Sequence, residues 1–196
     1  MFEILTTLGR TLGFSFAAGI NLYATVAILG LAKRYGWVTL PDQFAVFDND
    51  VVIGVAIVLY VIEFVADKIP WVDSLWDAVH TVIRPVGGAL IAVATLGDTN
   101  PTMEGLVALL GGTIAAGTHF SKAGTRAVAN TSPEPISNWV LSISEDVFVI
   151  GLATLALKYP VAAAVVVIVG VVLMIVFAAW IVRAVRRRWT RRPAMA

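Results

Sequence analysis

The sequence predicts an all-α integral membrane protein with about six transmembrane helices, some of them short or broken. Of its 196 residues, 59% are hydrophobic and only 14% are charged, whereas about a quarter of the residues of a soluble domain are charged. The mean hydropathy is +0.87, and several apolar runs approach the roughly 20 residues that a helix needs to cross a bilayer. This composition excludes an ordinary soluble domain, and it excludes disorder, which requires low hydrophobicity.

Two segments are long enough to cross hydrocarbon without a charged residue. Thr11–Ala32 is the first, and Val161–Val182 is the last, where Pro160 is suited to the first helical turn. Four others are shorter or carry charges: Val51–Ala66, Thr81–Gly97, Met103–Thr118 and Trp139–Leu157. We expect one membrane domain, with a first three-helix unit at 1–99, a second at 100–185 and a basic tail at 186–196.

Basic residues predict the orientation of the chain. Six of the fourteen Lys and Arg residues lie between Arg183 and Arg192, and short loops rich in Lys and Arg stay in the cytoplasm. With six spans, eleven basic residues fall on one side and three on the other. We therefore predict a multi-pass membrane protein with both termini cytoplasmic. The tail also suits anionic lipid headgroups.

A weak internal similarity predicts a 3+3 inverted repeat. LGFSFAAGIN from Leu12 aligns with LGGTIAAGTH from Leu110, which places Asn21 opposite His119. VLYVIEFV from Val58 aligns with VLSISEDV from Val140, which places Glu63 opposite Glu145. Because each unit has three spans, the second would cross in the opposite sense, as in many secondary transporters. The alternative is chance similarity between helices rich in small residues.

Ionisable residues form two stripes at helical spacing. Asp73, Asp77, His80 and Arg84 share one helix face, and His119, Lys122, Arg126 and Asn130 share another. We expect the stripes to face each other with at least one Asp–Lys or Asp–Arg contact. The first stripe has an alternative interpretation as the solvated face of an interfacial helix, and the second as ion pairs that only hold helices together. The remaining aromatic residues are interpreted as lipid contacts and interface anchors.

Further acids lie inside apolar spans, where an ionisable residue is by default a functional candidate. Glu63 and Asp67 form one pair, Glu145 and Asp146 another, and Asn21 offers an interhelical hydrogen bond. Catalytic and cofactor motifs are missing, so no enzyme activity and no cofactor are expected. With two histidines and no cysteine, no metal site is expected either.

The chain resembles a family of small, uncharacterised bacterial integral membrane proteins known only as a domain of unknown function. The residues that carry the resemblance are EFVADKIPWVDSLWDAVHTVIRP, NTSPEPISNWVLSISED and GINLYATVAILGLAKR. It extends from Gly19 to Asp146 and does not include the arginine tail. The resemblance implies a helical membrane protein located in the bacterial inner membrane, and it implies no substrate, cofactor or mechanism.

The favoured hypothesis is a small secondary transporter for an anionic or zwitterionic solute. Glu63 and Glu145 would carry a coupling proton or a cation, the basic residues would meet the solute, and the histidines would relay protons. One alternative is a lipid-phosphate flippase, and another is a structural or assembly partner in the membrane. The expected partners are the bilayer and a small-molecule or lipid-headgroup ligand, without nucleic acid. A homodimer is an open option, because six helices are few for a transporter.

Overall fold

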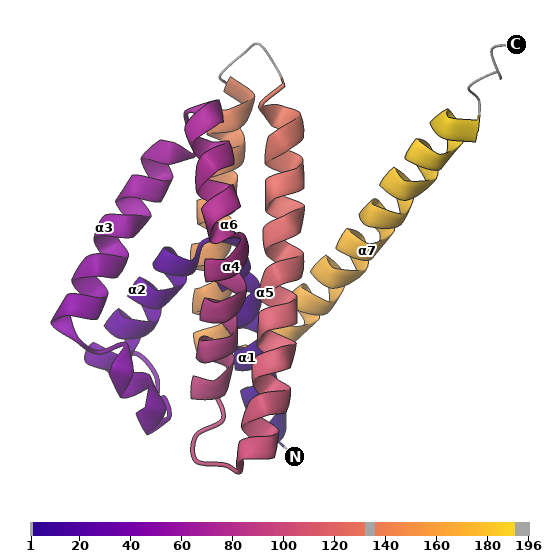
Figure 1. Cartoon of the computed structure of the whole chain (residues 1–196). Coiled ribbons are helices and arrows are strands. Elements are labelled where there is room, and N and C mark those ends of the chain that lie inside the picture. Colours follow the sequence, from indigo (N-terminus) through magenta and orange to yellow (C-terminus); the bar gives the residue numbers. More distant parts are fainter. Residues whose placement is uncertain (1, 132–135, 191–196) are drawn as a thin grey trace, which may run out of the picture.

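The computed structural model describes residues 2–131 and 136–190, and in this part of the chain the backbone is helical without strands (Figure 1). In chain order the elements are α1 (Phe2–Ile20), α2 (Leu22–Arg34), the 3₁₀ helix η1 (Asp42–Val46), α3 (Asp50–Ala66), α4 (Pro70–Ala94), α5 (Pro101–Ala129), α6 (Ile136–Lys158) and α7 (Pro160–Thr190). The all-helical expectation is therefore confirmed. Residues 191–196 of the basic tail lie outside the described residues.

Helix α1 occupies the centre of the molecule and packs against α4, α5, α6 and α7. The core around it contains fully buried apolar side chains such as Phe14, Ile91 and Val149. Lipid is as apolar as these side chains, so close packing rather than exclusion of water favours helix association in a membrane. Helix α7 inclines away from the bundle in Figure 1, and only 11% of its apolar segment is buried.

The predicted first span, Thr11–Ala32, is not one helix, because the chain breaks at Asn21 between α1 and α2. Asn21 has an extended backbone, and its side-chain oxygen accepts a hydrogen bond from Ala24 N at 2.9 Å, which caps α2. Non-helical backbone inside a membrane needs partners within the protein. The Ile20 carbonyl meets this need by accepting from Lys122 Nζ at 3.3 Å.

Small residues set the register between α4 and α5, which run antiparallel. A Cβ added to Gly88 would lie 2.4 Å from Ala115 Cβ, and one added to Gly111 would lie 2.3 Å from Ala92 Cβ. Such contacts let two helix backbones approach closely. These contacts fix the register of the two helices. The polar residues further along α4 and α5 are therefore also paired at fixed positions.

The predicted inverted repeat receives no support from the packing of α1 and α5. Gly111 lies against Ser15, while Ala115 and Thr118 lie against Gly19, so residue numbers rise together along both helices. The two helices that the repeat would relate by inversion are therefore parallel neighbours. Close approach between these helices accounts for Gly19, Gly111 and Ala115, which agrees with the chance-similarity alternative.

The six-span count is not confirmed. Among the described residues, three helices are long and apolar enough to cross a membrane: Pro70–Ala94, Ile136–Lys158 and Pro160–Trp180. Figure 1 also shows that α1 begins at the lower end of the bundle and α7 ends at the upper end. Six complete crossings would return the chain to the end where it started.

The lower end is closed by the segment between α2 and α3. Phe44 of η1 is fully buried, and its ring meets the Phe14 ring edge-on at 6.1 Å between centroids. Arg34 binds Asp48 and Asp50, each at 2.8 Å, which joins the end of α2 to the start of α3. The hydrogen bond with Asp48 raises the pKa of Arg34.

Candidate functional site: a buried network of charged side chains

Both sequence stripes are buried, and they face each other. Asp73, Asp77, His80 and Arg84 of α4 are between 0% and 5% exposed, as are His119, Lys122 and Arg126 of α5. The interpretation of the first stripe as a solvated face is therefore wrong. The expected Asp–Arg contact between the stripes is present, since Arg126 Nε lies 4.0 Å from Asp73 Oδ1. The α4–α5 register explains this, because it pairs the upper turns of both helices.

Lys122 connects four helices. Its Nζ lies 3.2 Å from Glu63 Oε1 and 3.2 Å from Asp67 Oδ2, both contributed by the C-terminal end of α3. Glu145 Oε2 of α6 follows at 3.8 Å. Together with the Ile20 carbonyl of α1, these groups surround an ammonium that is 2% exposed. Glu63 and Glu145, which the proposed repeat aligns with each other, thus contact the same cation.

Arg84 lies on the α4 side of the same network. Its Nη2 donates to Glu63 Oε1 at 2.8 Å, and its Nη1 lies 3.2 Å from Asp77 Oδ1. The same Nη1 is 2.9 Å from His119 Nδ1 on α5. The guanidinium and the Glu63 side chain are both 0% exposed. Breaking such a pair by removing one partner costs about 3–5 kcal/mol, because it leaves an uncompensated buried charge.

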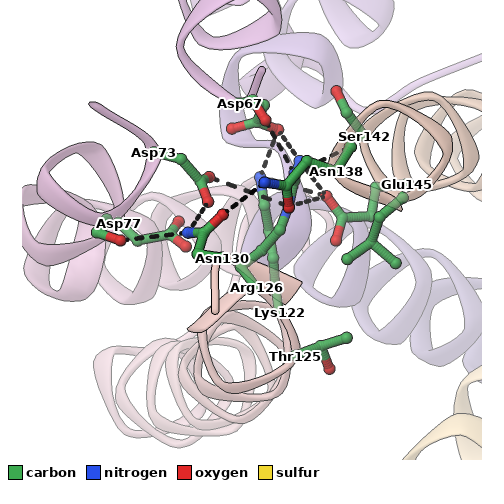
Figure 2. A network of polar contacts seen from close by, with 12 residues as sticks. Asp67, Asp73, Asp77, Lys122, Thr125, Arg126, Asn130, Asn138, Ser142 and Glu145 are labelled. Carbon is green, nitrogen blue, oxygen red and sulfur yellow. Dashed lines mark hydrogen bonds and ion pairs between the residues drawn. The ribbon is translucent and has the colours of Figure 1, made fainter. Parts of the chain in front are cut away.

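Arg126 is held by α3 and α6 (Figure 2). Its Nη2 donates to Asp67 Oδ2 at 2.7 Å and lies 3.0 Å from Glu145 Oε2, while Nε donates to the same Glu145 oxygen at 3.2 Å. Its Nη1 donates to the backbone carbonyls of Asp67 and Asn138 at 3.0 and 3.3 Å. All three guanidinium nitrogens therefore have partners.

The two histidines are opposite tautomers, and the hydrogen-bond partners of each ring determine which nitrogen carries the hydrogen. Arginine only donates, so His119 Nδ1 must accept from Arg84, and His119 Nε2 then carries the hydrogen that faces Thr81 Oγ1 at 3.1 Å. His80 Nδ1 lies 2.7 Å from the Trp76 carbonyl, which only accepts, so this nitrogen carries the hydrogen. His80 Nε2 is then free to accept from the Tyr23 hydroxyl at 2.8 Å.

Asp146 and Asn21 extend the network to the break between α1 and α2. Asn21 Nδ2 donates to Asp146 Oδ1 at 3.1 Å, and both residues are buried. The other carboxylate oxygen, Asp146 Oδ2, is buried without a hydrogen-bond partner. Asn21 is therefore both an interhelical hydrogen-bond donor and the cap of α2.

Asn130 closes the network at the upper end of α5. Its Nδ2 donates to Asp73 Oδ2 at 2.8 Å, and its Oδ1 accepts from Asn138 Nδ2 of α6 at 2.8 Å. The predicted site residues therefore lie near one another on α3, α4, α5, α6 and the α1–α2 break, while the described contacts of the Asn21–Asp146 pair and of His80 do not join them to the ion pairs around Lys122.

Acids outnumber bases in this set. Three cationic side chains, Arg84, Lys122 and Arg126, face six carboxylates: Glu63, Asp67, Asp73, Asp77, Glu145 and Asp146. Buried carboxylate oxygens without a hydrogen-bond partner occur on Glu63, Asp67, Asp73 and Asp146. A buried charge without compensation is costly, so the network as a whole favours positively charged partners.

Sequence analysis missed four members of the site. Tyr23 and Trp76 were interpreted as lipid or interface contacts, but Tyr23 contacts His80 and the Trp76 ring stacks on it at 4.6 Å between centroids. Asn138 and Ser142 are buried on α6. Their spacing of four from each other, and of four again to Asp146, forms a polar helix face that could have indicated them.

Within the described residues, no group of three or more His, Cys, Asp or Glu side chains is arranged to hold a metal ion. The basic side chains between the carboxylates explain this, because they occupy the oxygens that a hard cation such as Mg²⁺ would use.

Comparison with known proteins places the chain in a family but gives no relative of known activity. No curated protein and no solved structure matches the chain significantly. Residues 8–183 match a family described as a domain of unknown function, DUF4126. This range covers every residue of the buried network and extends beyond the Gly19–Asp146 region in which the sequence resemblance was recognised. The chain is a member of the DUF4126 family.

Proposed function

We propose that this protein is a small secondary transporter for a small polar solute, coupled to a proton or another cation. The observation that carries the proposal is the buried charged network beside the broken helix α1–α2. Broken helices and buried ionisable residues characterise the substrate and ion sites of transporters. The inverted repeat plays no part in the proposal.

Burial cost supports a functional reason for the network. Replacing a buried ion pair by apolar side chains of similar volume is often neutral or stabilising, so a buried pair is weak evidence for stability alone. Here the network contains unpaired carboxylate oxygens as well as pairs. A proton or another cation that binds to the network and is released during transport would account for these unpaired oxygens.

Asp146 is our candidate for the group that carries the coupling cation, beside Glu63 and Glu145. Glu63 and Glu145 already contact basic side chains, whereas the only hydrogen bond described for the Asp146 carboxylate comes from the Asn21 amide. A single proton or cation at Asp146 would neutralise it without breaking an ion pair.

The second candidate is a structural or assembly partner in the membrane, and the burial of the basic side chains favours it. Arg84, Lys122 and Arg126 are between 0% and 5% exposed and already paired. The same observation disfavours the lipid-phosphate flippase, since these basic side chains already bind carboxylates, and Arg84 Nε, which has no hydrogen-bond partner, is buried away from a headgroup.

Flux measurements separate the two candidates. The full chain is reconstituted in vesicles that contain a pH-sensitive dye, and ethylammonium, glycine or inorganic phosphate is added outside as a cationic, zwitterionic or anionic probe. We expect a probe-dependent proton flux that Asp146→Asn abolishes and Asp98→Asn preserves, because Asp98 lies in the exposed α4–α5 loop. Correctly folded protein without flux for any probe would support the structural partner instead.

A further inference from the structure

An open cavity of about 320 Å³ lies at the surface between α4 and α5, beside the buried network. Its polar lining consists of Asp73, Ser74, Asp77 and Thr81 from α4 and Arg126 from α5, and Phe120 and three alanines complete it. The volume is at the lower end of the roughly 300–1,000 Å³ typical of small-molecule sites. The cavity is therefore large enough for a small organic solute.

The carboxylates at this cavity are incompletely paired. Asp73 is 1% exposed, and its Oδ1 has no hydrogen-bond partner, because the nearest cationic atom, Arg126 Nε, lies 4.0 Å away. Asp77, one helical turn further, directs Oδ1 to Arg84. Figure 2 shows Asp73 and Asp77 on the same side of the network. An unpaired buried carboxylate oxygen costs free energy, and a ligand that donates a hydrogen bond to it would recover part of that cost.

The hydroxyls at the cavity are hydrogen-bond acceptors. Ser74 Oγ donates its hydrogen to the Pro70 carbonyl, and Thr81 Oγ1 donates to the Asp77 carbonyl. Each oxygen already accepts one hydrogen bond, Ser74 from Asn130 Nδ2 and Thr81 from His119 Nε2, and keeps one further lone pair for a ligand. Their lone pairs therefore add to the acceptors of the two carboxylates.

Arg126 does not make the cavity an anion site, although it contributes to the lining. Its guanidinium donates to groups of α3 and α6, and all three nitrogens are occupied by Asp67, Glu145 and the Asn138 carbonyl. An anion in the cavity would meet two buried carboxylates and no donor that is free to turn toward it. This disfavours an anionic solute.

We propose that the α4–α5 cavity binds the primary ammonium group of a small organic amine, through Asp73 and Asp77. The ammonium supplies up to three N–H donors for Asp73 Oδ1, Asp77 and the hydroxyl oxygens, and the Phe120 ring offers a cation–π face. One added positive charge reduces the acid excess of the network. This inference rests on the proposed transporter function and replaces the anionic or zwitterionic solute of the sequence hypothesis by a cationic one.

Binding is tested on the full chain in detergent micelles, with ethylammonium, tetramethylammonium and propionate as probes. We expect ethylammonium to raise the melting temperature in a concentration-dependent manner, since a ligand of the folded state stabilises it. Tetramethylammonium lacks N–H donors and should act much more weakly, and propionate should have no effect. Asp73→Asn should raise the Kd for ethylammonium at least about tenfold, because a charge-assisted hydrogen bond is lost. Asp98→Asn is the matched control.

A second variant fills the cavity without changing any charge. Ala78 is exposed and lines the cavity, so Ala78→Leu should leave the basal melting temperature near that of the wild type and abolish the ethylammonium effect. If Asp73→Asn fails to fold, this variant still tests whether ethylammonium binds in the cavity. An ethylammonium shift that survives in Ala78→Leu, or a wild type stabilised only by propionate, would overturn the proposal.

The outcomes also separate this inference from the transport function. Ethylammonium binding that depends on Asp73 and Ala78, without flux in vesicles, would establish the cavity and refute transport. Flux that needs Asp146 but no ethylammonium binding would support transport and refute the cavity assignment.

Discussion

Lys122 shows how much one side chain depends on its surroundings. In the sequence it is one member of a basic stripe, whereas in the structure its ammonium contacts acids from α3 and α6 and a carbonyl of α1. Long-range pairs of this kind leave no local trace in the sequence. The membership of both stripes could be predicted from spacing, but not which acid each cation binds.

Reversal of this charge provides a prediction at the scale of the residue. Lys122→Asp places a third carboxylate between Glu63 and Asp67, so we expect a loss of stability of at least about 3–5 kcal/mol. Thermal unfolding in detergent measures it. Lys158→Asp is the control, because Lys158 is exposed at the end of α6 and surface substitutions of this kind contribute little. Similar melting temperatures for both variants would contradict the fold-clamping role of Lys122.

Close contacts between small residues determine how the helices are arranged. Glycines and alanines bring α1, α4 and α5 together, and the resulting register aligns the two polar stripes. The sequence shows the small residues but not their direction of packing, since parallel and antiparallel helices use the same residue types. For this reason the similarity between the Gly19 and Gly117 segments was interpreted as an inverted repeat.

Substitutions at Gly19 and Gly117 distinguish close helix packing from an internal sequence repeat. A Cβ at Gly19 would lie 2.4 Å from the Ala115 carbonyl oxygen and 2.8 Å from Ala115 Cα, whereas nothing lies within 4 Å of a Cβ at Gly117. We expect Gly19→Ala to cost roughly 1–3 kcal/mol or more. Gly117→Ala should be neutral or stabilising by up to about 1 kcal/mol, because alanine favours the helix. Equal melting temperatures would indicate that α1 and α5 do not approach as described.

In the part of the chain that the structure describes, α1 begins and α7 ends at opposite ends of the bundle (Figure 1). The start of α1 lines a surface pocket with Leu96 and Met103 at the α4–α5 loop, and Gln43 binds Asp98 of the same loop. The broken pair α1–α2 therefore begins and ends at one end of the bundle, and α7 ends at the other. The expectation that both termini share a side assumed that Thr11–Ala32 crosses the membrane as one helix.

Reporter fusions test this arrangement in cells. The arginine-rich end of α7 and the α3–α4 junction, which contains Lys68, lie at the upper end, whereas the end of α2, which contains Lys33 and Arg34, lies at the lower end. The positive-inside rule therefore places the upper end in the cytoplasm. We predict that fusions at the N-terminus and in the 97–101 loop report the same, external side, and that a C-terminal fusion reports the cytoplasm. An N-terminal fusion that reports the cytoplasm would restore the six-span topology.

Composition and periodicity by themselves determined the helical membrane class, the two polar stripes and the acids inside the spans, because these depend on local spacing along each helix. Tertiary structure decided the break at Asn21, the parallel packing of α1 and α5, the partners of each charge and the cavity beside Asp73. These features arise from contacts between segments far apart in the chain. Their energies depend on distance and burial, which the order of residues does not specify.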